Sequence, residues 1–575
     1  MSEPNNDAHR RRGEALFWGF ALFSLLLFLG RGMWNSAEGQ LAEAVREMLL
    51  SGNFRCATLN WQPIGYRFLP WCWLSLPLAL LFGLEEFSLR LIGVGFAVLG
   101  LYGNFVLAAR WFDRRTALLS NWMLLACGAF YLSGRAATWD MAVLAWSLWL
   151  TIGVLQWKES ASFFAAFACT AAFALGGWLF GPIYWFWWLC WLLPLALLPG
   201  NVPLRKRLKA MSGAAAALLL GLLLFYLWCR FGLPHPVWQW RNFAAAWIAA
   251  AHRLTGLRVW SGAAASWGQL LLPWSIFYLW TLVFWCVNRK KLPAELAAIG
   301  LGALISGGIL TLFRGAFFWR GLLPILPLWV IFGAGALTSE CTCCCRRDTV
   351  VKLFRLILAF LASLALAMPM TLPLRRLWEM PTLPAPAVWL LLLGAAVVLL
   401  LLIFEDAEDS PVAGFFGLPG RLAALAVGSA VLSLVLLCLP LFMDFRNEVR
   451  SRSIGELGRQ LAELENGRVI YYDRKPDAVL WFYLNLHHPI EVAGRDREAA
   501  LRSFVDRNRS GQVAVVAKMR PERLLELSHL AEAAGLPLSE DAAFWHEAAG
   551  VLPHPVRRHL AWRFEIPSAE SGQRQ

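Results

Sequence analysis

The segment RRRGEALFWGFALFSLLLFLG, residues 10–30, sets the fold class of this chain. Its apolar part, 15–30, approaches the roughly 20 apolar residues that a helix needs to cross a bilayer. Positively charged residues flank spans on the cytoplasmic side, so the arginines at 10–12 predict a cytoplasmic amino terminus. No small-residue cleavage site follows, which favours an anchor over a removable signal peptide.

The composition also indicates a membrane protein. Hydrophobic residues make up 58% of the 575 residues, with a mean hydropathy of +0.54, whereas soluble domains contain about 45–50%. The 32 Trp residues suit a bilayer, because indole rings favour the membrane–water interface. The net charge of +14 lies in short basic runs between apolar segments, so it indicates cytoplasmic loops and argues against a nucleic-acid partner.

Apolar segments of spanning length continue well beyond the first. We predict a polytopic α-helical membrane protein with about thirteen transmembrane helices, at 15–30, 87–109, 117–132, 141–157, 163–178, 183–198, 211–231, 270–287, 296–313, 322–337, 351–368, 388–404 and 422–443. The shorter stretch 69–84 contains Pro70 and Pro77, and we interpret it as a re-entrant or interfacial helix. The basic runs at 110–115, 205–209, 289–291 and 346–347 then all lie inside.

Beyond Asp444 the sequence becomes polar, which predicts a small soluble α/β domain at 444–575 after a transmembrane domain at 1–443. The transmembrane domain includes a first periplasmic loop, 31–86, with juxtamembrane helices. Residues 468–472 and 512–517 are typical of strands, and 478–486, 498–508 and 522–534 of helices. The charge count places the soluble domain on the periplasmic side. It contains no phosphate loop, metal set or nucleophile motif, which favours a lid or docking module.

A cysteine cluster falls between two predicted spans, at Cys341, Cys343, Cys344 and Cys345. No His or further Cys pair lies close enough to complete a zinc set, so we interpret it as part of a reduced cytoplasmic loop. No cofactor is expected, although a divalent metal stays an open alternative.

The first external loop carries the candidate chemistry, in WNSAEGQLAEAVREML at residues 34–49. Helical spacing places Glu43 and Glu47 on one face at i and i+4, with Arg46 beside Glu43 at i+3. Glu38 precedes them, and an acid here could serve as a general base for an acceptor hydroxyl or amine. The alternative is a solvated amphipathic helix on the membrane surface.

A series of motifs along the chain resembles a known group of enzymes. Residues 37–74, AEGQLAEAVREMLLSGNFRCATLNWQPIGYRFLPWCWL, resemble the first periplasmic loop of the aminoarabinose (lipid A) transferase and protein O-mannosyltransferase families. The family pattern runs roughly DE-x-RYAEIAREML-x-SGDW, LNG-x-P and EKPP. Further resemblances follow in the same order, at GLEEFSLRL (83–91), GRAATWDM (134–141), GP (181–182), LPWS (272–275) and LLPILP (322–327).

The resemblance implies the membrane glycosyltransferase fold called GT-C, a polyprenyl-phosphate sugar donor and a carboxyl-terminal periplasmic domain. An acceptor attacks the anomeric carbon with inversion while polyprenyl phosphate leaves. Positive charge must stabilise the departing phosphate, and the candidates are arginines at the membrane boundary or outside it: Arg46, Arg67, Arg135, Arg314 and Arg320. Each could instead be a boundary residue whose charge reaches the interface.

The chain departs from the family pattern at two acids. Ala37 aligns with the Asp of the family's Asp-Glu pair, and Tyr66 aligns with the acid of EKPP, whose Lys is replaced by Arg67. Either Glu38 therefore acts as the base with Asp140 in support, or transfer activity has been lost. The Lys of the family's TKGP motif aligns with Phe180.

Four further residues are predicted to orient substrates: Asn35, Asn60, Tyr66 and Glu43. The acceptor is expected to be a periplasmic lipid, glycan or protein, and the chain is expected in the inner membrane, in contact with its lipids. Two alternatives stay open. One is a catalytically inactive binder of a lipid-linked sugar. The other is a transporter or flippase, which the scarcity of charges within the spans disfavours.

Overall fold

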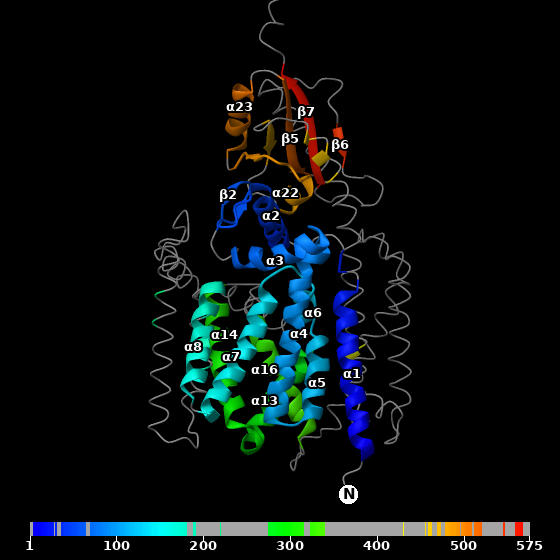
Figure 1. Cartoon of the computed structure of the whole chain (residues 1–575), viewed down its shortest axis with the longest axis vertical. Helices are drawn as coiled ribbons and strands as arrows, with labels where there is room; N and C mark the ends of the chain where they lie inside the picture. The colour runs from blue at the N-terminus through cyan, green and yellow to red at the C-terminus, as the bar shows by residue number, and fades with distance from the viewer. Residues whose placement is uncertain are drawn as a thin grey trace, which may run out of the picture. The chain divides into compact units, whose positions relative to one another are not determined.

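Figure 1 shows a computed structural model of the chain. It describes residues 4–27, 29–30, 36–64, 69–160, 162–180, 274–314, 322–339, 468–472, 478–494, 496–508, 511–519, 544–546 and 558–566, with a few isolated positions between these ranges.

The described residues belong to two compact units. The first contains Met1–Leu29 and the described helices from Arg90 onward, and the second combines Gly30–Leu89 with the described parts of Leu441–Gln575. The first loop, which the sequence pattern grouped with the transmembrane domain, therefore clusters with the carboxyl-terminal region. The boundary between these units falls inside the helix that begins at Glu86.

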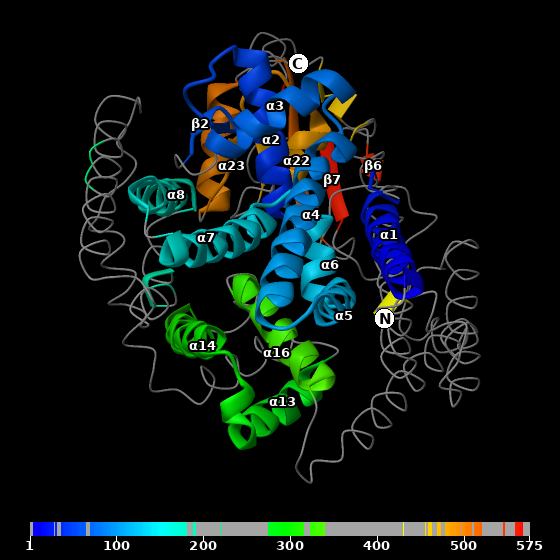
Figure 2. The same cartoon turned by 60° about the horizontal axis from the view of Figure 1, so that its bottom comes forward.

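The first unit is built of helices that run side by side (Figure 1). Figure 2 shows α7 beside α8 and α13 beside α16. Its described helices are α1 (Pro4–Leu26), α4 (Glu86–Trp111), α5 (Arg114–Leu125), α6 (Gly128–Gly134), α7 (Asp140–Ser160), α8 (Phe163–Phe180), α13 (Ser275–Val287), α14 (Ala294–Arg314) and α16 (Leu326–Thr338), with 3-10 turns at Arg289–Lys291 and Leu323–Ile325.

Within the described part of the chain, α4 and α7 are long and apolar enough to cross a membrane, and α5 with α6 would form a third span if the pair is one broken crossing. The chain is thus a helical membrane protein, while the count of about thirteen spans stays a prediction. Predicted spans at 183–198, 211–231, 351–368, 388–404 and 422–443 lie almost wholly outside the described residues.

The segment predicted as a span at 117–132 forms two helices, α5 and α6, and its crossing of the membrane stays a prediction. The chain bends by 74° between α5 and α6. Cys127, which precedes α6, adopts an extended backbone with ψ 119°, so the ladder of i to i−4 hydrogen bonds cannot run through it. Apolar composition continues across the break, which is why hydropathy did not reveal it.

Charged side chains gather where α4, α7 and α14 meet. Arg110 Nη2 lies 2.8 Å from Glu159 Oε1, and Lys158 Nζ lies 3.2 Å from Glu295 Oε1. The loops after α4, after α7 and before α14 therefore lie at one end of the helices. The charge pattern of the sequence predicts the same side of the membrane for the loops at 110–115 and 289–291.

The second unit contains a five-stranded sheet in the order β4-β3-β5-β7-β6. Strand β3 pairs in parallel with β4 and β5, while β5 with β7, and β7 with β6, pair antiparallel. The strands are β3 (Val469–Tyr471), β4 (Glu491–Val492), β5 (Gly511–Met519), β6 (Phe544–His546) and β7 (Arg558–Ile566), and the helices are α22 (Ala478–Leu484) and α23 (Arg497–Arg507).

Two strands and two helices of this unit were predicted from the sequence and are confirmed. The sequence pattern indicated strands at 468–472 and 512–517 and helices at 478–486 and 498–508. Strands β4, β6 and β7 were not predicted. The helix expected at 522–534 lies outside the described residues.

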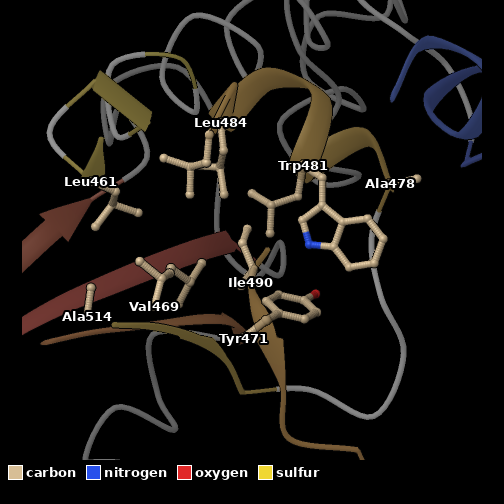
Figure 3. Close-up of a cluster of buried hydrophobic side chains, with 11 residues drawn as sticks. Leu461, Val469, Tyr471, Ala478, Trp481, Leu484, Ile490 and Ala514 are labelled. Carbon is tan, nitrogen blue, oxygen red and sulfur yellow. The ribbon is translucent and has the colours of Figure 1, made fainter. Parts of the chain in front are cut away.

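One face of the sheet packs against α22 (Figure 3). Val469 and Tyr471 alternate with Ile470 along β3, so they share the face that contacts Trp481 and Leu484. This core anchors α22.

The same unit includes the first loop. It forms α2 (Ser36–Ser51), a short hairpin of β1 (Thr58–Leu59) and β2 (Gln62–Pro63), and α3 (Leu69–Phe82). At 14 residues, α3 is shorter than the two spanning helices above. Its assignment as re-entrant or interfacial stays a prediction.

One glycine of the first unit is required by close packing. A Cβ at Gly93, on α4, would lie 2.5 Å from the carbonyl oxygen of Ala136. Ala136 lies in the turn that joins α6 to α7, so the absence of a side chain at Gly93 lets α4 approach this turn.

We expect Gly93→Ala to lower the thermal unfolding midpoint by several degrees, because α4 must shift from the backbone of Ala136. Gly95→Ala in the same helix is the control. A Cβ at Gly95 meets nothing within 4 Å, and alanine favours a helix by about 1 kcal/mol over glycine. Unfolding of the purified full-length variants in detergent checks this, and equal midpoints for the two variants would contradict it.

Candidate functional site

Helix α2 carries the proposed base, and its charged side chains are all buried. The exposed fractions are 0% for Glu38, 1% for Glu43, 5% for Arg46 and 0% for Glu47. The alternative of a solvated amphipathic helix is therefore wrong. Burying a charged side chain is costly unless it is paired or neutralised, so the surroundings of each one decide what it can do.

A close contact with α22 follows Glu38 directly. A Cβ at Gly39 would lie 2.6 Å from both the backbone nitrogen and Cγ2 of Val479, so the two helices approach closely only because this residue is glycine. Glu38 therefore lies one residue from a close contact between α2 and α22.

Arg46 joins α2 to the end of α22. Its Nε and Nη2 donate to the two carboxylate oxygens of Glu43 at 2.8 and 2.7 Å, which confirms the i, i+3 pairing predicted from spacing. Its Nη1 donates to the carbonyl oxygen of Leu486 at 2.9 Å and to Asn485 Oδ1 at 3.3 Å. The sequence predicted that Arg46 binds the donor phosphate. To do so, its guanidinium would have to break hydrogen bonds to these partners and form new ones to the phosphate. Glu43 was predicted to orient substrate, and both its carboxylate oxygens accept hydrogen bonds from Arg46.

Asn60 joins the hairpin to the segment after α22. Its Nδ2 donates to the carbonyl oxygen of Ile490 at 2.6 Å, and its Oδ1 accepts from the backbone N–H of Ile490 at 2.7 Å. Asn60 has a φ of +51°, a conformation that asparagine tolerates better than most residues. The side-chain amide thus makes the same pair of hydrogen bonds to the backbone of Ile490 that a neighbouring strand would make. Both of its polar atoms have a hydrogen-bond partner.

Glu47 is a buried acid whose carboxylate is only partly hydrogen-bonded. Its Oε2 accepts from the backbone N–H of Trp61 at 3.0 Å, while Oε1 has no hydrogen-bond partner within the described part of the chain. Burial raises the pKa of Glu47 to about 7, and the charge of Glu43 adds to that rise. Hydrogen bonding from Thr58 and Trp61 acts in the opposite direction. Glu47 therefore exchanges a proton near neutral pH, a property that helical spacing alone did not assign to it.

Asp140 and Arg135 belong to the first unit. Asp140 begins α7, and its Oδ2 accepts from Thr138 Oγ1 at 2.9 Å. Arg135 is buried, and its Nη1 donates to the carbonyl oxygens of Ser24 and Leu25 at 2.7 and 3.1 Å. These carbonyls lie in the last turn of α1. Arg135 therefore caps a helix, which is an alternative to the predicted contact with the donor phosphate.

Arg90 has a similar role that was not predicted from the sequence. Its Nη1 donates to the carbonyl oxygen of Leu29, just beyond α1, at 2.9 Å, and Tyr131 Oη donates to the carbonyl oxygen of Ser24 at 2.7 Å. Arg90 lies in the segment GLEEFSLRL, so an arginine within an otherwise apolar helix was the available signal.

The other predicted residues are placed only in part. Arg314 is the last residue of α14, and its side chain lies outside the described residues, as do Asn35, Tyr66, Arg67, Arg320 and the cysteines at 341–345. Glu38 and Asp140 belong to different units. No group of three His, Cys, Asp or Glu within the described ranges could hold a metal ion.

Comparison with known proteins shows what the chain resembles. No family model matches it. A 148-residue segment is 32% identical to the undecaprenyl phosphate-alpha-4-amino-4-deoxy-L-arabinose arabinosyl transferase of Enterobacter sp. (strain 638), and the match spans 24% of this chain and about a quarter, 26%, of that protein.

The fold similarity is much more extensive. Two crystal structures of ArnT from Cupriavidus metallidurans, one apo and one bound to undecaprenyl phosphate, superpose with TM-scores of 0.64 and 0.61. Each match covers 96% of this chain and 97% of that one, at 20% identity. The chain has the ArnT fold and resembles the GT-C glycosyltransferases, as the motif series predicted.

We expect Glu47 to make stability depend on pH. Its folded pKa lies above its unfolded value, so its contribution to the free energy of unfolding is complete below pH 4.5 and is lost as pH rises toward 7. The loss is up to about 3 kcal/mol. Glu47→Gln should remove this loss, which unfolding of the full-length protein between pH 5 and pH 8 measures.

The matched control is Glu498→Gln. Glu498 is exposed on α23 and pairs with Arg502 at 2.6 Å, so this variant should keep the pH dependence of the wild type. Identical pH profiles for the wild type and Glu47→Gln would show that Glu47 does not titrate in this range.

Proposed function

We propose that this protein is a glycosyltransferase that moves a sugar from a polyprenyl-phosphate donor to a lipid, glycan or protein acceptor. The observation that carries the proposal is the retained acid Glu38, in a segment resembling the first periplasmic loop of aminoarabinose transferases, within a chain that has the ArnT fold along 96% of its length. The comparison structure bound to undecaprenyl phosphate and the local match to an undecaprenyl phosphate-dependent transferase favour a donor of that class.

The proposed reaction is an inverting displacement. The acceptor oxygen or nitrogen attacks the anomeric carbon and gives its proton to Glu38. The bond between the anomeric carbon and the phosphate oxygen breaks, and polyprenyl phosphate leaves with the electron pair. Asp140, whose Oδ2 accepts from Thr138 Oγ1, is proposed as the supporting acid of this reaction.

The departing phosphate requires positive charge. Since Arg46 and Arg135 bind backbone carbonyls, we favour Arg67, Arg314 and Arg320 for this role. Arg314 is the last residue of α14.

We also propose that the chain lies in the inner membrane with its amino terminus in the cytoplasm. The unit that contains α2 and the sheet would then lie on the periplasmic side, with the soluble domain beginning near residue 444. The charge pattern of the loops supports this orientation.

A catalytically inactive binder of lipid-linked sugar is a second candidate. Ala37 and Tyr66 occupy positions where the family pattern has acids, and their replacement favours binding without transfer.

We expect Glu38→Gln to lower transfer at least 100-fold, because general-base catalysis contributes about 10²–10⁴-fold, and Asp140→Asn to lower it less. Purified protein in nanodiscs is supplied with radiolabelled polyprenyl-phosphate sugars and crude envelope acceptors. Glu498→Gln is the control and should transfer as the wild type does.

The outcomes separate the two candidates. Wild-type turnover that Glu38→Gln abolishes supports a transferase with its base in the first loop. Donor binding without turnover for any acceptor supports the binder. Full activity in a Glu38→Gln, Asp140→Asn double variant would exclude both acids from the mechanism.

A further inference from the structure

The carboxyl-terminal region contacts the first loop along one continuous seam. Gly39 meets Val479, Arg46 meets Leu486 and Asn60 meets Ile490. The partners advance in the same order along both segments, so α2 and α22 run parallel, and the hairpin continues the seam beyond them.

The contacts at the two ends of α2 differ, since one is steric and the other is polar. At Gly39 the contact is steric, because α22 occupies the space that any side chain would need. At Arg46, two turns or about 10 Å farther along α2, the contact is polar and buried. A steric stop at one end and directional hydrogen bonds at the other fix both the rotation and the axial position of α2.

Asn60 adds a third fixed point. Its amide makes both a donated and an accepted hydrogen bond with Ile490. Trp61, the next residue, donates its N–H to Glu47 on α2, so the hairpin is tied to the helix as well as to the carboxyl-terminal region.

A fourth contact lies at the far end of the loop. Tyr483 Oη, on α22, donates to Glu86 Oε1 at 2.7 Å. Helix α22 and the segment after it therefore contact the loop both near its start, at α2, and near its end.

We infer that α22 and residues 485–490 are a positioning element for the first-loop acid, with Arg46 and Asn60 as positioning residues that act through α2 on Glu38. This inference rests on the proposed function. Glu38 is buried one residue before the contact of Gly39 with Val479, so rotation or sliding of α2 displaces its carboxylate. A displacement of about 1 Å at a reacting group can cost 100-fold in rate.

The test uses the full-length protein in nanodiscs with a radiolabelled polyprenyl-phosphate sugar. Asn60→Gly keeps the left-handed backbone accessible and removes both hydrogen bonds to Ile490. Arg46→Gln removes the fork to Glu43 and Leu486, and Arg46→Lys keeps the charge without the fork. Arg502→Gln, in an exposed i, i+4 pair on α23, is the matched control.

Kinetics and amide exchange are measured together. We expect Asn60→Gly and Arg46→Gln to lower kcat at least 10-fold, to leave KM for the donor within about twofold, and to speed amide hydrogen exchange in residues 36–51. For Arg46→Lys, kcat and the rate of amide exchange in residues 36–51 should lie between those of Arg46→Gln and the wild type. Arg502→Gln should match wild type in all three measurements.

Other outcomes overturn the inference in distinguishable ways. Faster exchange in 36–51 with unchanged kcat would show that the seam only stabilises the fold. A rise in KM for Arg46→Gln with unchanged kcat would assign Arg46 to donor binding. A wild-type protein that transfers no sugar would refute the proposed function itself, whereas an active wild type with unaffected variants refutes the positioning alone.

Discussion

The burial of Arg46 is the constraint on which the unit that carries the proposed base depends. A guanidinium removed from water must keep charged or polar partners, because leaving it unpaired would be strongly destabilising. Arg46 finds them in Glu43, three residues away, and in Leu486 and Asn485, more than four hundred residues away in sequence. Since the second set lies in the carboxyl-terminal region, α2 reaches its buried state only when that region is folded against it.

In the helical unit, buried arginines at the end of α1 also have polar partners. The last carbonyl groups of a helix have no partner within it, and here Arg135 and Tyr131 donate to carbonyl oxygens in the last turn of α1. Arg90 donates to the carbonyl oxygen of Leu29, just beyond this helix. Arginine suits this role because its planar group offers several donors and stays charged. An arginine that the sequence assigns to a phosphate site can therefore donate its hydrogen bonds to backbone carbonyl groups instead.

The proposed site keeps one acid of the family pattern, Glu38, and has a different residue at the adjacent position. Glu38 persists where the family pattern has a pair of acids, and Ala37 removes the other. The chain nevertheless keeps a fold shared with ArnT along nearly all of its length. Catalysis depends on where charge is placed, not on the fold alone. Glu38, Asp140 and the three arginines at 67, 314 and 320 are therefore the positions on which the proposed chemistry depends.

The sequence by itself determined the membrane class, most described helices, strands β3 and β5 and the pairing of Glu43 with Arg46, because apolar runs, alternation and i, i+3 spacing are local. Its motif series also predicted the fold. Only the tertiary structure decided that α2 is buried, that Asn60 binds Ile490, that Arg135 caps α1 and that the helix breaks at Cys127. Each of these depends on contacts between distant residues or on a backbone angle, and neither is encoded in local hydropathy or spacing.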